Sequence, residues 1–138
     1  MTNSPREVAQ TFYNMIHAGA FVELFASLTE DCVIEYFGPA VIPFAGRFIG
    51  REKCRLFFDH VANDVAIHEF RQDDFMPGDG MIAVTGHLHL SFKATGRRYA
   101  SDYVHVIHVR DGKIARFRDF QDSAQAAYVC ADVSTPIR

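Results

Sequence analysis

The stretch that decides the fold is SDYVHVIHVRDGKIARFRDFQD, residues 101–122. Two strand-like runs flank an Asp-Gly pair in its middle, and this arrangement is a strong signal for a β-hairpin. The first run is apolar on both faces, which is typical of a strand covered on both sides. The second run alternates, so that Arg116 and Arg118 share one face while Asp119 shares the other with apolar residues. The sequence therefore predicts a hairpin whose second strand points a carboxylate inward.

An inward carboxylate is the most informative feature, because an unpartnered carboxylate is costly to bury. His105 lies on the first strand at nearly the same distance from the turn as Asp119, so the hairpin places the two side chains opposite each other. A carboxylate beside an imidazole fixes its tautomer, and such a pair can move a proton near neutral pH. Ligand binding without chemistry, and a purely structural pair in the core, are the alternatives.

Composition excludes several classes of protein. The chain has 138 residues, of which 49% are hydrophobic and 22% charged, with thirteen Phe and no Trp. These values predict one globular domain, residues 1–138, with a phenylalanine-rich core. A net charge of −3 argues against nucleic-acid binding. No apolar run is long enough to span a membrane, and the N-terminus lacks the pattern of a signal peptide, so we expect a cytoplasmic protein without a membrane partner.

The cysteines and one pair of histidines are the candidates for binding a metal ion. Three widely spaced cysteines without a C-x-x-C pattern exclude a simple disulfide framework and a cysteine-based zinc site. His87 and His89 share one face of a predicted strand, a spacing that metal ions can use, but no carboxylate is clearly placed with them. The alternative is an outer sheet face covered by a partner subunit, which the apolar Val104 and Val106 favour. We therefore expect no metal, no cofactor and a homodimer through the outer sheet face.

The rest of the chain supplies helices first and then strands. Ser4 and Glu7 form a capping box around Pro5, which predicts a helix that ends at Gly19. The expected elements that follow are a helix 20–28, a turn 29–31, a strand 32–37, a loop 38–50 with a short strand 47–49, a helix 51–62, strands 65–75 and 81–93, the hairpin, and a helix 124–129. Consecutive hairpins with helices on one side predict an α+β fold with a curved antiparallel sheet around a cavity.

The inward positions of these elements predict an apolar pocket for a hydrophobic small molecule. Asp119 and His105 are the expected acid/base pair, and the hydroxyl of Tyr36 or Tyr103 is the expected donor to a developing oxyanion. The expected substrate-binding residues are Phe12, Ile34, Phe58, Leu88, Leu90, Phe92 and Phe117.

Four stretches, in this order and spacing, resemble the SnoaL-like, ketosteroid-isomerase-like branch of the NTF2-like superfamily. They are residues 12–19, 29–35, 44–52 and 109–114. The resemblance implies a cone-shaped α+β fold with mixed strand pairing at its edge, a deep apolar pocket between three helices and the sheet, and dimerisation through the outer sheet face. The superfamily contains isomerases, polyketide cyclases, epoxide hydrolases, dehydratases and non-catalytic binders, so the fold does not settle the function.

At three positions the sequence differs from the ketosteroid isomerases that it resembles. Ketosteroid isomerases use an Asp base and an oxyanion hole of a Tyr and a protonated Asp. Those positions fall on Tyr36, Phe12 and His105, so steroid isomerisation by that mechanism is not expected. The neighbouring Tyr13 and Asp102 are offset and are expected to face elsewhere. The expected function is an acid/base isomerase, cyclase or dehydratase of a hydrophobic carbonyl compound, and the alternative is a non-catalytic module that binds an apolar ligand.

Overall fold

The structure is a computed structural model that describes residues 3–131. Helices and strands follow one another as α1 (Pro5–Ala18), α2 (Phe21–Ala26), β1 (Leu28–Tyr36), β2 (Gly46–Ile49), α3 (Arg51–Asp64), β3 (Val65–Gly78), β4 (Met81–Phe92), β5 (Arg98–Arg110), β6 (Lys113–Phe120) and α4 (Ser123–Cys130). No helix within residues 3–131 is long and apolar enough to cross a membrane.

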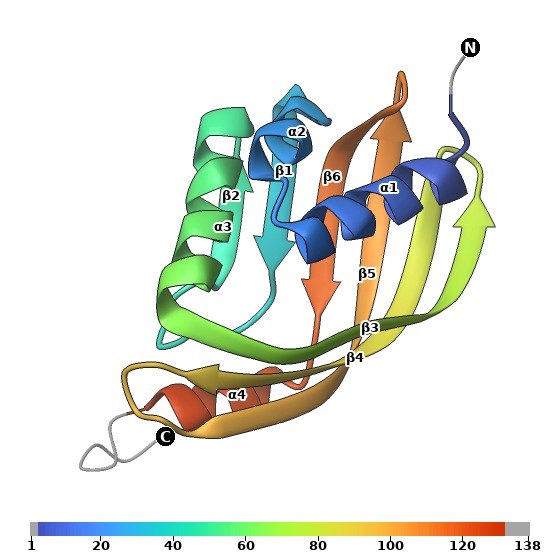
Figure 1. Cartoon of the computed structure of the whole chain (residues 1–138). Coiled ribbons are helices and arrows are strands. Elements are labelled where there is room, and N and C mark those ends of the chain that lie inside the picture. Colours follow the sequence, from blue (N-terminus) through green and yellow to red (C-terminus); the bar gives the residue numbers. More distant parts are fainter. Residues whose placement is uncertain (1–2, 132–138) are drawn as a thin grey trace.

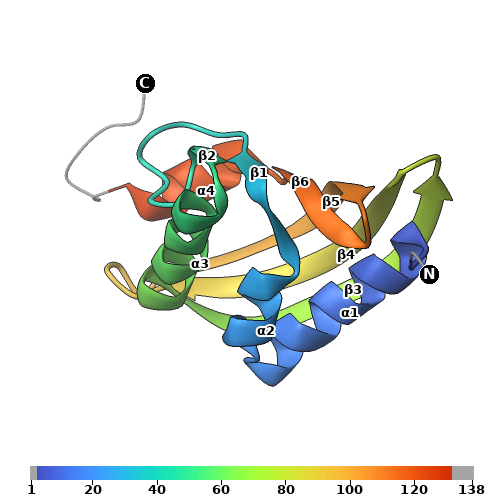
Figure 2. The same cartoon turned by 90° about the horizontal axis from the view of Figure 1, so that it is seen from above.

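The six strands form one sheet in the order β2-β1-β6-β5-β4-β3. Neighbouring strands are antiparallel except β1 and β6, which run parallel. The sheet curves around α1, α2 and α3, and α4 lies at the bent ends of β4 and β5 (Figures 1 and 2). The predicted α+β fold, with a curved sheet wrapped around three helices from the N-terminal half, is confirmed.

The hairpin that opened the sequence analysis joins β5 to β6. Asp111 and Gly112 both adopt positive φ angles, 53° and 74°, as the two-residue turn that suits the twist of a hairpin requires. The two strands then pair with His105 opposite Asp119. The turn itself pairs Arg110 with Lys113 and Val109 with Ile114, and the register then shifts by one residue between His108 and Val109. This irregularity, and not the turn alone, places Asp119 directly opposite His105.

Helix α1 begins and ends where the sequence predicts. The side chain of Ser4 accepts a hydrogen bond from the Glu7 backbone, Glu7 completes the capping box, and Gly19 closes the helix with φ at 68°. Its buried side chains are Val8, Ala9, Phe12 and Tyr13. The helix therefore turns Tyr13, as well as Phe12, toward the sheet.

Several predicted element ends are wrong, and tertiary pairing explains the clearest case. Residues 29–31, predicted as a turn, belong to β1, which starts at Leu28. Leu28 is buried and pairs with Ile114 of β6, and the alignment of the two strands shifts between Leu28 and Val33. Pairing with a strand far along the chain thus overrides the polar, turn-like composition of this stretch. The second helix is correspondingly shorter than expected and ends at Ala26.

Candidate functional site

An apolar cavity of about 160 Å³ lies between the helices and the inner face of the sheet. Its lining is formed by Phe12, Ile16, Phe21, Phe44, Phe57, Phe58, Val61, Ala62, Val65, Ile67, Phe70, Leu88, Leu90, His105, Phe117, Asp119 and Gln121. Only the side chains of His105, Asp119 and Gln121 in this lining are polar. The cavity is therefore an apolar chamber with a single polar region, as is typical of a small-molecule site.

Most of the predicted binding residues lie in this lining. Those that do are Phe12, Phe58, Leu88, Leu90 and Phe117. The two that do not are Ile34 and Phe92, which are almost completely buried in the core. Their inward direction was predicted, but neighbouring side chains cover them.

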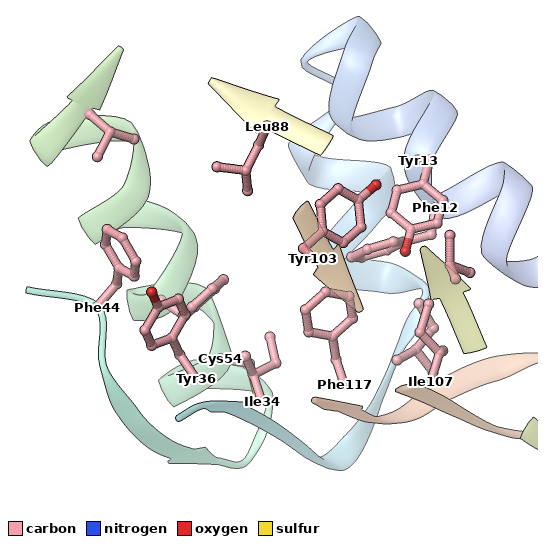
Figure 3. Packing of buried hydrophobic residues seen from close by; sticks show 14 of the residues in the cluster. Phe12, Tyr13, Ile34, Tyr36, Phe44, Cys54, Leu88, Tyr103, Ile107 and Phe117 are labelled. Carbon is pink, nitrogen blue, oxygen red and sulfur yellow. The ribbon is translucent and has the colours of Figure 1, made fainter. Parts of the chain in front are cut away.

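The inner aromatic wall is built from segments far apart in the sequence. Phe12 of α1 contacts Phe117 of β6 with ring centroids 5.5 Å apart, and it contacts Phe58 of α3 at 6.3 Å. Figure 3 shows Phe12, Tyr13, Tyr103 and Phe117 gathered in one aromatic group. This packing holds the helices at a set distance from the sheet and leaves the chamber between them.

Asp119 and His105 meet as the hairpin predicts. The Nε2 atom of His105 lies 3.3 Å from Oδ1 of Asp119, and both side chains are buried, with 3% and 8% exposed. The two groups are in close polar contact, and a protonated imidazole would make this contact an ion pair. The second ring nitrogen, Nδ1, is then left to another partner.

That partner is Tyr13, and the expectation that Tyr13 faces elsewhere is wrong. Its hydroxyl lies 2.7 Å from Nδ1 of His105, and the residue has no exposed surface. Burial, and then the nearby Tyr103 and Asp119, raise the pKa of Tyr13 far above its usual value, so the phenol stays protonated. A hydroxyl can donate to Nδ1 of a neutral imidazole or accept from an imidazolium. Tyr13 therefore suits both protonation states of His105.

Aromatic rings hold the imidazole in place. The ring of His105 stacks on Tyr103 with centroids 4.1 Å apart and contacts Phe117 at 4.5 Å. A ring that packs against two aromatic rings, is hydrogen-bonded at Nδ1 and touches Asp119 through Nε2 has little freedom to rotate. His105 is therefore a rigid support for Asp119.

Gln121 is a polar residue of the cavity lining that the sequence interpretation did not select. Its Nε2 atom lies 3.1 Å from each carboxylate oxygen of Asp119. Its Oε1 atom accepts hydrogen bonds from the hydroxyls of Tyr99 at 3.0 Å and Tyr36 at 3.4 Å. The signal was present, since Gln121 continues the alternation that turns Asp119 inward.

The two predicted tyrosine donors reach other partners. Tyr36 contacts Gln121 and lies outside the cavity lining. The hydroxyl of Tyr103 donates to the backbone oxygen of Arg71 at 2.8 Å. A Cβ atom at Gly86, the residue opposite Tyr103 on β4, would lie only 2.0 Å from that Arg71 oxygen and 2.4 Å from the Tyr103 hydroxyl oxygen. The missing side chain of Gly86 thus lets the Tyr103 ring lie across β4 and reach β3.

The outer face of the sheet carries a second buried carboxylate, Glu35 of β1. Arg116 lies 2.7 Å from it, Arg47 3.6 Å and Arg118 3.7 Å. The guanidinium of Arg118 also lies over the ring of Phe120 at 5.2 Å. Glu35 is therefore held by full positive charges.

The two histidines considered for a metal lie on this outer side. His87 hydrogen-bonds through Nδ1 to Asp102 at 2.9 Å, so a carboxylate does lie beside it, contrary to the expectation. The ring of His89 lies 5.1 Å from that of His68. Across residues 3–131, no three His, Cys, Asp or Glu side chains are grouped so that they could hold a metal ion.

Comparisons with known proteins agree with this fold. The model of the SnoaL-like domain family matches residues 9–117. An NTF2-like protein from Burkholderia xenovorans superposes with a TM-score of 0.85 at 22% identity, covering 95% of this chain and 98% of that one. A proposed SnoaL-like polyketide cyclase from Mesorhizobium loti gives a TM-score of 0.70 at 20% identity, covering 86% and 99%.

A proposed isomerase from Rhodopseudomonas palustris gives a TM-score of 0.75 at 17% identity, covering 91% of this chain and 95% of that one. At these identities the likeness to solved structures establishes the fold alone. No curated protein matches the sequence.

Proposed function

Because this chain belongs to the SnoaL-like domain family, we propose that it is an acid/base enzyme acting on a hydrophobic carbonyl compound. The reaction class is proton abstraction and return next to the carbonyl group, as in an isomerisation, a cyclisation or a dehydration. Asp119 is the base that faces the substrate, and His105 supports it. Ketosteroid isomerisation is not proposed, since Phe12, Tyr36 and His105 occupy the positions of the groups that it uses.

The observation that carries the proposal is the set of partners around Asp119. The carboxylate is buried at the polar region of the cavity, and it contacts the Gln121 amide and the His105 imidazole. Among residues 3–131, no Lys or Arg side chain lies within ion-pair distance of it. A carboxylate that is not paired with a lysine or arginine of the protein is free to meet a substrate in the cavity.

The neighbouring groups suggest how the proton moves. Asp119 takes the proton from the carbon next to the carbonyl, and Gln121 and His105 hold the carboxylate toward the cavity as its charge changes. A substrate carbonyl oxygen at this end of the cavity would lie near the Gln121 amide and the His105 imidazole, the other polar groups of the lining. Tyr36 acts through Gln121, which its hydroxyl contacts.

Deuterium exchange tests the chemistry without knowledge of the natural substrate. Cyclic enones are incubated with the protein in D2O, and NMR follows exchange at the carbon next to the carbonyl. We expect exchange with the wild type, about a hundredfold or greater loss in Asp119→Asn, and a smaller loss in His105→Ala. Unchanged exchange in both variants would overturn the assignment.

Ligand binding without chemistry is the second candidate, and the nearly complete apolar lining of the cavity favours it. In that case an enone binds, and no exchange above the buffer rate occurs in the wild type or in Asp119→Asn. Binding is measured separately by calorimetry, so the same ligands distinguish the two functions.

A homodimer through the outer sheet face is proposed with either function. Phe37 and Phe120 stack there at 4.8 Å with 41% and 36% of their surface exposed, and Val104 beside them is 37% exposed. Apolar surface grouped on a sheet face favours a protein partner. Sedimentation should show a dimer at micromolar concentration and a shift toward monomer in Val104→Glu. A wild-type monomer would exclude the dimer.

A further inference from the structure

The size of the cavity restricts the ligands that it can hold. Its volume is about 160 Å³. A cavity of about 150 Å³ lined by Leu, Ile and Phe side chains holds one benzene molecule. The space in this chain therefore matches one six-membered ring, and a fused ring system would need more room.

The inner walls offer little room for expansion. Phe57 and Phe58 of α3 pack edge to face at 5.4 Å, and Phe12 links them to Phe117 of the sheet. Phe12, Phe57 and Phe117 are almost fully buried. Close-packed rings cannot withdraw without opening voids elsewhere, so growth of the cavity in this direction is unfavourable.

The outer end of the cavity is different. Phe21, which is 39% exposed, lines this end together with Phe58, and their ring centroids lie 6.5 Å apart. Phe21 is the first residue of α2, a helix of six residues whose N-cap makes no side-chain hydrogen bond. Its ring can therefore be removed or moved at a lower cost than the buried rings.

A groove of about 430 Å³ lies directly behind these two rings. Phe21, Phe58 and Ala62 line both the groove and the cavity, and the remaining groove residues are Val22, Phe25, Arg55 and Asp59. The rings of Phe21 and Phe58 thus form a partition between an inner chamber and an outer groove on α2 and α3.

We propose that Phe21 and Phe58 are a size filter that limits the substrate of this site to a single-ring carbonyl compound. The inference rests on the proposed function for the carbonyl group, which the polar region around Asp119 receives. The ring count depends only on the volume and on the partition. Removal of the Phe21 ring joins the chamber to the groove and admits a second ring.

Three ketones of increasing ring number test the filter: cyclohex-2-enone, 1-tetralone and anthrone. Calorimetry or NMR titration measures their affinities for the full chain. We expect the wild type to bind cyclohex-2-enone at least about tenfold more tightly than 1-tetralone, since overfilling a packed site costs about 1–3 kcal/mol. Anthrone should bind more weakly still, although larger apolar ligands otherwise bind more tightly.

The variants locate the filter. In Phe21→Ala we expect the ratio of 1-tetralone to cyclohex-2-enone affinity to rise at least about tenfold, and in Phe58→Leu to rise less. Leu56→Ala, an equally apolar deletion at a 49% exposed position of α3, is the control and should keep the wild-type ratio.

Each outcome decides the inference. A wild type that prefers the larger rings, an unchanged ratio in both filter variants, or no binding of any of the three ketones would overturn it. Absence of deuterium exchange in cyclohex-2-enone or 1-tetralone, where either of them binds, would instead count against the proposed function. A correct ring-size order without exchange would leave the filter standing and make the protein a binder.

Discussion

Two buried carboxylates lie at adjacent positions of the same parallel strand pair, on opposite faces of the sheet. Across β1 and β6, Tyr36 pairs with Asp119 and Glu35 pairs with Arg118. Glu35 and Asp119 are exposed to almost the same extent, at 7% and 5%. Glu35 is surrounded by three arginines, whereas Asp119 is held by an amide and an imidazole. Equal burial therefore does not mean equal surroundings: Glu35 is enclosed by arginines on the outer face, whereas Asp119 faces the cavity, where a substrate could reach it.

The largest expected effect is a difference in activity between variants of the two carboxylates. Asp119→Asn should lower deuterium exchange by about 10²–10⁴-fold, the usual contribution of a general base. Glu35→Gln should leave the exchange rate within about twofold, because Glu35 lies on the face away from the cavity. The pair of rates is measured under identical conditions with one enone. Equal losses in the two variants would remove the distinction between the faces.

The next largest expected effect is a difference in stability between variants of Glu35 and Asp119. Glu35→Gln removes the charge that partners three arginines, and within the described residues Arg118 Nε already lacks a hydrogen bond. We expect a loss of about 1–3 kcal/mol in the free energy of unfolding, since the arginines are partly exposed to solvent. Asp119→Asn should cost less, because an amide oxygen can still accept from Gln121 and His105. Urea unfolding curves of the two variants check the order.

A smaller effect concerns the support of the inner carboxylate. Tyr13→Phe removes the hydroxyl that partners Nδ1 of His105. We expect about a tenfold lower exchange rate, which corresponds to one buried hydrogen bond, together with a shifted pH–rate profile. Tyr128→Phe, on the exposed side of α4, is the matched control. A loss of stability with an unchanged pH profile would reduce Tyr13 to a packing residue.

The smallest expected effect is on the pH dependence of stability, through a histidine beside the arginines of the outer face. Burial, and then the neighbouring Arg116 and Arg118, lower the pKa of His108. The unfolded chain then binds this proton more readily than the folded one, so stability falls as the pH falls below about 6.5, the ordinary pKa of His. Between pH 7.5 and pH 5.5, the melting temperature of His108→Gln should therefore fall by less than that of the wild type. An equal loss in both proteins would show that neither burial nor the two arginines lowers the pKa of His108.

Local patterns determined the parts of the site that depend on one strand or one turn. The Asp-Gly turn set the hairpin, and strict alternation turned Asp119, Phe117 and Gln121 to the inner face. Counting back from the turn brought Asp119 to within one residue of the position opposite His105, and the register shift between His108 and Val109 made the two residues direct partners. These predictions succeed because the side-chain direction in a strand repeats every two residues and needs no knowledge of distant segments.

Packing between distant segments decided the rest. Tyr13 reaches His105 across 92 positions of the chain, and the rotation of α1 that allows it is set by what the helix packs against. The direction of the Tyr103 hydroxyl depends on the missing side chain of Gly86 on the next strand. The sequence alone therefore determined the fold, the turned-in carboxylate and its imidazole. The partners of these groups and the volume in front of them belong to the tertiary structure, because they arise from contacts that no local periodicity encodes.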